Sequence, residues 1–165
     1  MIRGVVGDLA SAQADAIARP ATTRLEPLTP ALQRLDAAAG PRFVEQRRVR
    51  HELPAGASVV TAAGDLPVEF VVHLVLGSAE DSVTTDTLRR AMDAALFQCM
   101  QWRIETLAMP IPSAGNLAPE GALTVVLDAL REHMRNATHP ANVLVVTATD
   151  AERDLVTARI GQGGL

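Results

Sequence analysis

Runs of apolar residues, many of them β-branched, recur along the chain and predict buried β-strands. They cover residues 2–6, 57–62, 68–76 and 142–147, and residues 104–109 form a fifth run. Within each run the apolar positions are nearly continuous instead of alternating with polar ones. This pattern indicates a sheet that other elements cover on both of its faces.

Between these runs, hydrophobic residues recur at helical spacing and predict helices that pack on the sheet. The clearest stripe runs from Leu88 to Cys99, and a second one runs from Leu123 to Met134. In the second helix, the charged residues lie mostly outside the stripe. The apolar faces are therefore expected to lie against the sheet.

Capping residues mark two further helix starts. Thr29 stands before Pro30, which gives an N-cap followed by a proline at the first helical position. Asp150 is a second candidate N-cap, because a helical pattern follows it directly. Helices are expected from about residue 30 and about residue 151.

The order of these elements predicts the fold class. A strand and a short strand precede two helices and two strands, and the rest alternates helix and strand. This order is typical of a three-layer αβα domain with a mixed, mostly parallel sheet. The turn at residues 64–67 is short, so the two strands that it joins are expected to be antiparallel. With 165 residues and no linker or repeat, residues 1–165 are expected to form a single domain.

The composition narrows the class of partner. Apolar residues make up 48% of the chain and the formal net charge is −4, which is typical of a globular domain. Acidic residues outnumber basic ones and aromatic residues are scarce, so nucleic acid is not an expected partner. The chain has one cysteine and neither a signal segment nor a membrane-spanning run. A cytoplasmic protein that does not contact membranes is expected.

Several short motifs follow one another in the order and at the spacing of a known family. A Gly-Asp-Leu turn at residues 7–9 precedes Asp-Ala-Ile at 15–17, and Ala-Gly-Pro occurs at 39–41. The stretch 53–76 contains Gly-Ala, Gly-Asp-Leu-Pro and Phe-Val-Val-His in series, and Ser-Ala-Gly follows at 113–115. In these motifs the chain resembles the macro domains over almost its entire length.

The resemblance implies the macro fold and a cleft for ADP-ribose or a related adenine nucleotide. In the family, the aspartate that matches Asp8 accepts a hydrogen bond from the adenine amino group, and the next amide, here that of Leu9, adds a contact. A cleft at the ends of the strands agrees with the general rule for ligand sites in α/β sheets. From its residue type alone, Asp8 has the alternative role of capping a turn or a helix start.

The chain departs from the family pattern in the first phosphate loop. The family carries asparagines and several glycines there, whereas residues 18–28 of this chain contain neither. Three prolines lie in or beside this stretch, and prolines remove amide donors where glycines would let the backbone approach an anion. This loop is therefore not expected to hold a diphosphate in the family's manner, and the resemblance leaves Thr22 as its candidate contact.

The second phosphate loop is partly retained. Ser-Ala-Gly at residues 113–115 stands where the family has two glycines around a small polar residue, so partial cradling of an anion is expected. After the last strand, Ala148 lies where many members carry an aromatic residue that flanks the ligand, so that stacking contact is missing. The candidate ligand-binding residues are Asp8, Leu9, Thr22, Ser113, Ala114, Gly115, Asn116 and Ala148.

Other reactive side chains do not form a recognisable catalytic site. His73 lies in an apolar run and is expected to be structural, and Cys99 lies on the apolar helix stripe as a small hydrophobe. No spacing of histidine, cysteine or carboxylate is typical of a metal site. Arg47, Arg48 and Arg50 are expected to form a charged helix face. We assign no catalytic residue, no metal and no cofactor.

Two functions remain open from the sequence. The first is a divergent macro-domain-like module that binds ADP-ribose or a related adenine nucleotide without hydrolysis. The second is a macro-fold protein-interaction or assembly domain that has lost nucleotide binding and presents residues 26–30 or the arginine segment to a protein partner. An ADP-ribosyl hydrolase or deacetylase is third, because the asparagines and glycines that the family uses are absent. An enzyme is therefore not the expectation.

Overall fold

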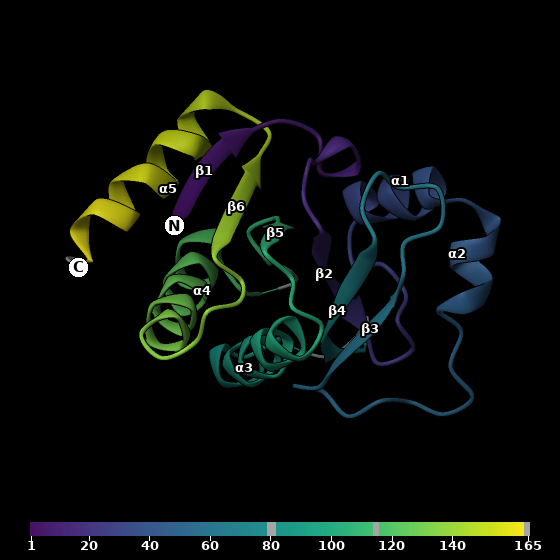
Figure 1. The fold of residues 1–165 in the computed structure, drawn as a ribbon. Coiled ribbons are helices and arrows are strands. Elements are labelled where there is room, and N and C mark those ends of the chain that lie inside the picture. The colour runs from purple at the N-terminus through teal and green to yellow at the C-terminus, as the bar shows by residue number, and fades with distance from the viewer. Residues whose placement is uncertain (79–81, 114–115, 164–165) are drawn as a thin grey trace.

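The computed structural model describes residues 1–78, 82–113 and 116–163. In this part of the chain, six strands form one sheet in the order β1-β6-β5-β2-β4-β3 (Figure 1). The strands are β1 (Ile2–Val6), β2 (Ala16–Thr22), β3 (Ser58–Ala62), β4 (Phe70–Gly77), β5 (Thr106–Met109) and β6 (Asn142–Thr147). Neighbouring strands are parallel except β3 and β4, which are antiparallel. Both predictions about the sheet are confirmed.

Helices cover both faces of this sheet and complete the three predicted layers. They are α1 (Pro30–Ala39), α2 (Pro41–Gln46), α3 (Thr85–Gln101), α4 (Pro119–Met134) and α5 (Asp150–Gln162), with a 3-10 turn η1 (Leu9–Ser11). Helices α1 and α2 pack on one face, and α3, α4 and α5 pack on the other (Figure 1). None of the helices in the described residues is long and apolar enough to cross a membrane.

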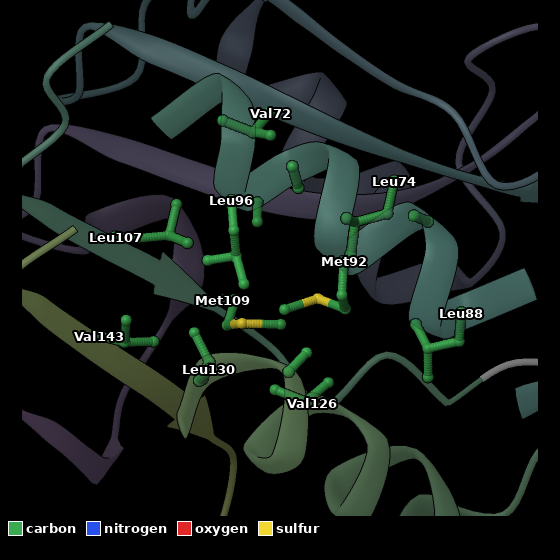
Figure 2. Close-up of a cluster of buried hydrophobic side chains, with 14 of the residues drawn as sticks. Val72, Leu74, Leu88, Met92, Leu96, Leu107, Met109, Val126, Leu130 and Val143 are labelled. Atoms are coloured by element: carbon green, nitrogen blue, oxygen red, sulfur yellow. The ribbon is translucent and has the colours of Figure 1, made fainter. Parts of the chain in front are cut away.

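The larger apolar core lies between the sheet and helices α3 and α4 (Figure 2). Both predicted helix stripes supply it: Leu88, Met92 and Leu96 come from α3, and Val126 and Leu130 come from α4. Full burial of one such side chain stabilises the fold by about 1.5–3 kcal/mol. The stripes therefore determine which face each helix turns to the sheet.

The opposite face holds a smaller core that also contains charged groups. Leu32 and Leu35 of α1 and Phe43 of α2 pack against Ile17 of β2 and Val71 of β4. Side chains alternate between the two faces along a strand, so residues two positions apart lie on the same face. Arg19 of β2 and His73 of β4 therefore lie on this face, and both are buried.

Helix ends follow the capping signals in part. The side chain of Thr29 accepts a hydrogen bond from the amide of Leu32, and Pro30 is the first residue of α1, as expected. At α5 the N-cap is Thr149, whose side chain accepts from the amide of Glu152, and Asp150 is already helical. The expectation that Asp150 is the cap was wrong by one residue, because a hydroxyl one position earlier reaches the same amide.

Strand β2 is longer than the short strand that the sequence predicts. Its seven residues, Ala16–Thr22, are all buried, so the loop that follows begins at residue 23 instead of 18. The pairing with β5 covers only Ala16 and Ile17, while the pairing with β4 continues to Thr22. One side of β2 therefore has no ladder partner beyond Ile17, and a proline at position 20 is tolerated there.

Candidate functional site

The candidate ligand residues follow the carboxyl ends of adjacent strands. Asp8 comes after β1, Ala148 after β6, Ser113 after β5, and Thr22 ends β2. These four strands are parallel neighbours in the sheet, so their ends meet at one edge. The structure thus brings Asp8, Thr22, Ser113 and Ala148 to a common edge, where ligands of α/β sheets bind.

Asp8 both caps a helical turn and keeps an open oxygen. Its Oδ1 accepts a hydrogen bond of 3.0 Å from the amide of Ala10, which starts the turn η1. Its Oδ2 and the amide of Leu9 have no partner among the residues that the structure describes. The capping role expected from the residue type is therefore observed, and one acceptor and one donor remain side by side.

The ends of β1 and β6 are joined next to Asp8. The amide of Gly7 donates to the carbonyl of Thr147 at 3.0 Å, and the Thr147 hydroxyl donates to the carbonyl of Val5, also at 3.0 Å. Ala148 is exposed, and its amide donates to Glu152 Oε2. Ala148 therefore offers a surface beside Asp8 but no free amide.

The second loop is described only at its two sides. Ser113 is half-buried, and its amide donates to the carbonyl of Ile111 at 2.8 Å. Asn116 is exposed. Ala114 and Gly115 lie outside the described residues.

The β2–α1 loop (residues 23–29) closes on itself. Thr22 is buried, and its Oγ1 accepts from the amides of Arg24 and Glu26 at 3.2 and 3.1 Å. The amides of Thr22 and Leu25 donate to the carbonyls of Glu26 and Thr22, and the amide of Thr23 donates to the carbonyl of Gly77. Every backbone N–H of residues 22–26 therefore donates a hydrogen bond within the protein, and Pro27 has no N–H.

Two leucines of the same loop are turned inward. Leu25 has a φ of 60° and is 1% exposed, packed with Ala21 and Val75. Leu28 is partly buried and touches the apolar cores of both sheet faces. The loop is thus packed against the rest of the protein through both leucines.

Arg19 is a completely buried arginine on β2, and sequence analysis did not assign it a role. Its Nη2 donates to the carbonyl of Leu25 at 2.6 Å and lies 3.5 Å from Asp36 Oδ2, while Arg47 Nε donates to that same oxygen at 2.8 Å. The guanidinium also lies 5.8 Å from the ring centroid of Phe43. A charged residue inside an otherwise apolar strand was the signal available in the sequence.

Burial opposes the charged forms of this cluster. It lowers the pKa of Arg19 to about 10 although Asp36 acts in the opposite direction, so Arg19 stays charged at neutral pH. It also raises the pKa of the Asp36 carboxyl, against the pull of Arg19 and Arg47. For both Arg19 and Asp36, the effect of removing the charge from water on the pKa therefore exceeds the effect of the opposite charge beside it, as is common for buried ion pairs. Arg19 Nε and Asp36 Oδ1 have no hydrogen-bond partner among the described residues.

Arg47 does not lie on a helix face. Helix α2 ends at Gln46, Arg47 caps it, and the segment beyond is irregular. The prediction that Arg47, Arg48 and Arg50 form a charged helix face was wrong. Helix α2 ends before them, and the side chain of Arg47 is turned inward and pairs with Asp36. Its side chain is only 12% exposed, whereas that of Arg48 is 71% exposed.

His73 of β4 lies beside this cluster and is fully buried. Its ring stacks on Phe43 with centroids 5.9 Å apart, and its Nε2 is 2.8 Å from Thr61 Oγ1. Because the Thr61 hydroxyl donates its proton to the carbonyl of Ala62, His73 Nε2 is the donor of this hydrogen bond. Burial lowers the pKa of His73 well below its usual range, and the charges of Arg19 and Arg47 add to the effect.

His73 is therefore expected to make stability depend on pH. The unfolded chain takes up a proton near the usual pKa of 6.5 and the folded chain does not, so stability is full above that pH and falls below it. The slope for one proton is at most about 1.4 kcal/mol per pH unit. Urea unfolding between about pH 7.5 and 5.5 should show a weaker pH dependence in His73→Gln than in the parent. His51→Gln, at an exposed position, is the control, and equal slopes in both variants would contradict the prediction.

The remaining reactive side chains are Cys99 and the residues that commonly bind metal ions. Burial raises the pKa of the Cys99 thiol to about 12, so it stays protonated at neutral pH. Among the residues that the structure describes, no three histidine, cysteine or carboxylate side chains are grouped closely enough to hold a metal ion.

Two hollows lie away from the predicted site. One, of about 330 Å³, lies at the amino ends of β1, β5 and β6 and is lined by Arg3 and Asn142 among others. The other, of about 500 Å³, lies between the β2–α1 loop and the end of α2. Neither is lined by Asp8, Leu9 or Ala148.

Comparison with known proteins gives a consistent result. The macro domain family profile matches residues 20–120. An Enterobacter protein named O-acetyl-ADP-ribose deacetylase is 28% identical, and the alignment covers 99% of this chain and 96% of that protein. A macro domain-containing protein of Methanosarcina mazei is 24% identical over 88% of this chain and 80% of its own length.

Solved structures agree at the level of the fold. The Oceanobacillus iheyensis macrodomain with ADP superimposes with a TM-score of 0.82 at 20% identity, covering 96% of this chain and 89% of the other. The Trypanosoma brucei macrodomain in complex with ADP-ribose gives a TM-score of 0.82 at 19% identity, covering 97% and 69%. The sheet order, the two helical layers and the matched profile lead to one conclusion. The chain belongs to the macro domain family.

Proposed function

We propose that this macro domain is a non-hydrolytic binding module that recognises the adenosine end of ADP-ribose or of a related adenine nucleotide. The contrast between two parts of the candidate site carries the proposal. Asp8 and Leu9 keep an open carboxylate oxygen and an open amide, whereas all amides of residues 22–26 are used within the protein.

The ligand class is supported by related proteins. The Trypanosoma brucei macrodomain was solved in complex with ADP-ribose and the Oceanobacillus iheyensis macrodomain with ADP. A relative at 28% identity is named as a deacetylase, which makes hydrolysis a natural alternative. Hydrolysis is disfavoured by residues 18–28, which stand where the family carries its asparagines. In this stretch Arg19 is buried in an ion pair, and the Thr22 hydroxyl accepts hydrogen bonds from two amides of the loop.

Binding at one end alone predicts a specific pattern of affinities. A hydrogen bond to the charged Asp8 contributes about 1.5–3 kcal/mol, which by itself gives only weak binding. The diphosphate and the second ribose of ADP-ribose gain little, because the amides of residues 22–26 already donate within the protein. AMP and ADP-ribose are therefore expected to bind with affinities within about threefold of each other.

Calorimetric titration with AMP, ADP and ADP-ribose tests this proposal. Asp8→Ala is expected to weaken binding of all three ligands by about tenfold or more, since it removes the charge-assisted hydrogen bond. Asp128→Ala, an exposed carboxylate on α4, is the matched control and should leave the affinities unchanged. In parallel, O-acetyl-ADP-ribose is incubated with the protein and acetate release is measured.

Three outcomes are informative. Equal affinities for AMP and ADP-ribose, lost together in Asp8→Ala, would support the proposal. An ADP-ribose affinity far above that of AMP would show that the loop does hold the diphosphate and would contradict it. Acetate release that is proportional to protein concentration would replace a binding module with an enzyme.

A second candidate function is a protein-interaction or assembly domain without nucleotide binding. The inward position of Leu25 and Leu28 favours it, because both leucines occupy space beside the strand ends. If none of the three nucleotides produces heat up to millimolar concentration, this second function becomes the better interpretation.

A further inference from the structure

The hollow beside the β2–α1 loop has three arginines among the eight residues that line it. Its apolar lining is Pro27, Val44 and Val49. Its five polar lining residues are Arg24 and Glu26 from the loop, Gln33 from α1, and Arg47 and Arg48 after α2. We call these five residues and the space between them the arginine hollow. Its volume of about 500 Å³ lies within the range of sites for small ligands. It is separate from the strand ends where Asp8 and Ala148 lie.

The wall nearest the core carries an uncompensated positive charge. Arg19 and Arg47 share the single carboxylate of Asp36, and both approach the same oxygen, Oδ2. Two guanidinium groups against one carboxylate leave an excess of one positive charge. Arg19 is completely buried, so the charge is presented to the hollow by Arg47, whose side chain is 12% exposed.

Arg47 also has hydrogen-bond donors that no described residue accepts from. Its Nε donates to Asp36, and neither of its terminal nitrogens has a hydrogen-bond partner among the described residues. The planar guanidinium presents paired donors that match phosphate and carboxylate oxygens. Because Asp36 fixes Nε, the side chain is already oriented, and binding does not have to order it.

The rim adds two arginines that are only loosely engaged. Arg24 Nε lies 3.6 Å from Glu52 and Arg48 Nη1 lies 3.4 Å from Glu45, and all four side chains are more than half exposed. Exposed pairs of this kind contribute about 0–1 kcal/mol, so either arginine can turn toward a ligand at little cost. Glu26 is the single acidic residue of the wall and leaves an excess of positive charge.

We propose that the arginine hollow is a second binding site, for a small ligand that carries adjacent oxyanion groups, such as a diphosphate or a polycarboxylate. Arg47 is the anchor that contacts the anion, and Arg24 and Arg48 close over it from the rim. The site contains no residue of the Asp8 end of the sheet, and its test uses no adenine nucleotide, so it can fail or hold separately from the nucleotide proposal.

The test is an amide-detected NMR titration of the whole chain with pyrophosphate and with citrate, at constant ionic strength. Saturable shifts are expected at residues 24–33 and 44–49. Arg47→Gln should weaken binding by about tenfold or more, and Arg24→Gln by a smaller factor. Arg34→Gln removes the same charge from an exposed position on α1 outside the hollow, and should leave the affinity unchanged.

Each result decides the proposal. Tighter binding of pyrophosphate identifies a phosphorylated ligand, and tighter binding of citrate identifies a polycarboxylate. Absence of saturable shifts, shifts confined to residues 7–9 and 148, or an equal loss in Arg34→Gln would each overturn it. So would a response to poly-glutamate alone, which would assign the hollow to an acidic protein segment. If Arg47→Gln unfolds, Arg24→Gln still tests the site, because Arg24 does not contact Asp36.

Discussion

Replacement of Asp36 by alanine is expected to lower the free energy of unfolding by about 3–5 kcal/mol. The carboxylate is the shared partner of Arg19 and Arg47, and its removal leaves a fully buried guanidinium without a counter-charge. Burial already disfavours the charged form of Arg19. Urea unfolding followed by circular dichroism measures the change, and the denaturant midpoint should shift strongly.

Two companion variants separate charge compensation from general damage. Asp154→Ala removes a carboxylate that pairs with Arg153 at the surface, where the Asp154 side chain is 72% exposed, so a change below about 1 kcal/mol is expected. The double variant Arg19→Met/Asp36→Leu replaces the pair by apolar groups and should regain most of the lost stability. A single Asp36→Ala variant as stable as the parent would show that the arginines find other partners, and the assignment would fail.

Phe43→Ala is expected to cost a similar amount, about 3–5 kcal/mol. Phe43 is completely buried, stacks on His73, and lies under the guanidinium of Arg19. Its loss opens a cavity in the smaller core, and it also removes the aromatic face that accompanies the buried charge. Thermal and urea unfolding measure the change.

Phe97→Ala is the matched control, because Phe97 on α3 is 54% exposed. The same substitution should there cost less than about 1 kcal/mol. Equal losses at the two positions would mean that the α1–α2 side of the sheet is loosely packed. In that case the oriented Arg47 on which the arginine hollow depends would not be held as described.

Much of the fold could be predicted from local patterns. The strands at residues 2–6 and 142–147 have the predicted boundaries, and the stripes that begin at Leu88 and Leu123 both face the sheet. Continuous apolarity is a strong signal because a sheet buried on both faces leaves few places for polar side chains. The antiparallel pair followed from turn length, which restricts the direction of the next strand.

The errors occur where tertiary contacts outweigh local preference. Residues 18–22 contain an arginine and a proline, which argue for a loop, yet they continue β2 because β4 pairs with them and the layers bury them. Arg47 follows a short helix and has no local reason to turn inward. Its position depends on Asp36, eleven positions away in the sequence, on a different helix.

The candidate site shows the same division. Motif order predicted that Asp8, Ser113 and Ala148 would each follow a strand, and the sheet order makes those strands neighbours whose ends lie at one edge. Missing glycines predicted that the first loop would lose its anion-binding role. Composition could not reveal that the amides of residues 22–26 close on the loop itself, because that depends on the backbone path.

Local patterns were enough to predict the fold class, the resemblance to the family and the missing glycines of the first phosphate loop, because periodic burial and short motifs depend on neighbours in the chain. The tertiary structure alone decided the buried Arg19–Asp36–Arg47 cluster, the inward leucines and the arginine hollow. These features combine residues from β2, α1 and the segment after α2. A buried charge is stable only beside its partner, and only folding brings those partners together.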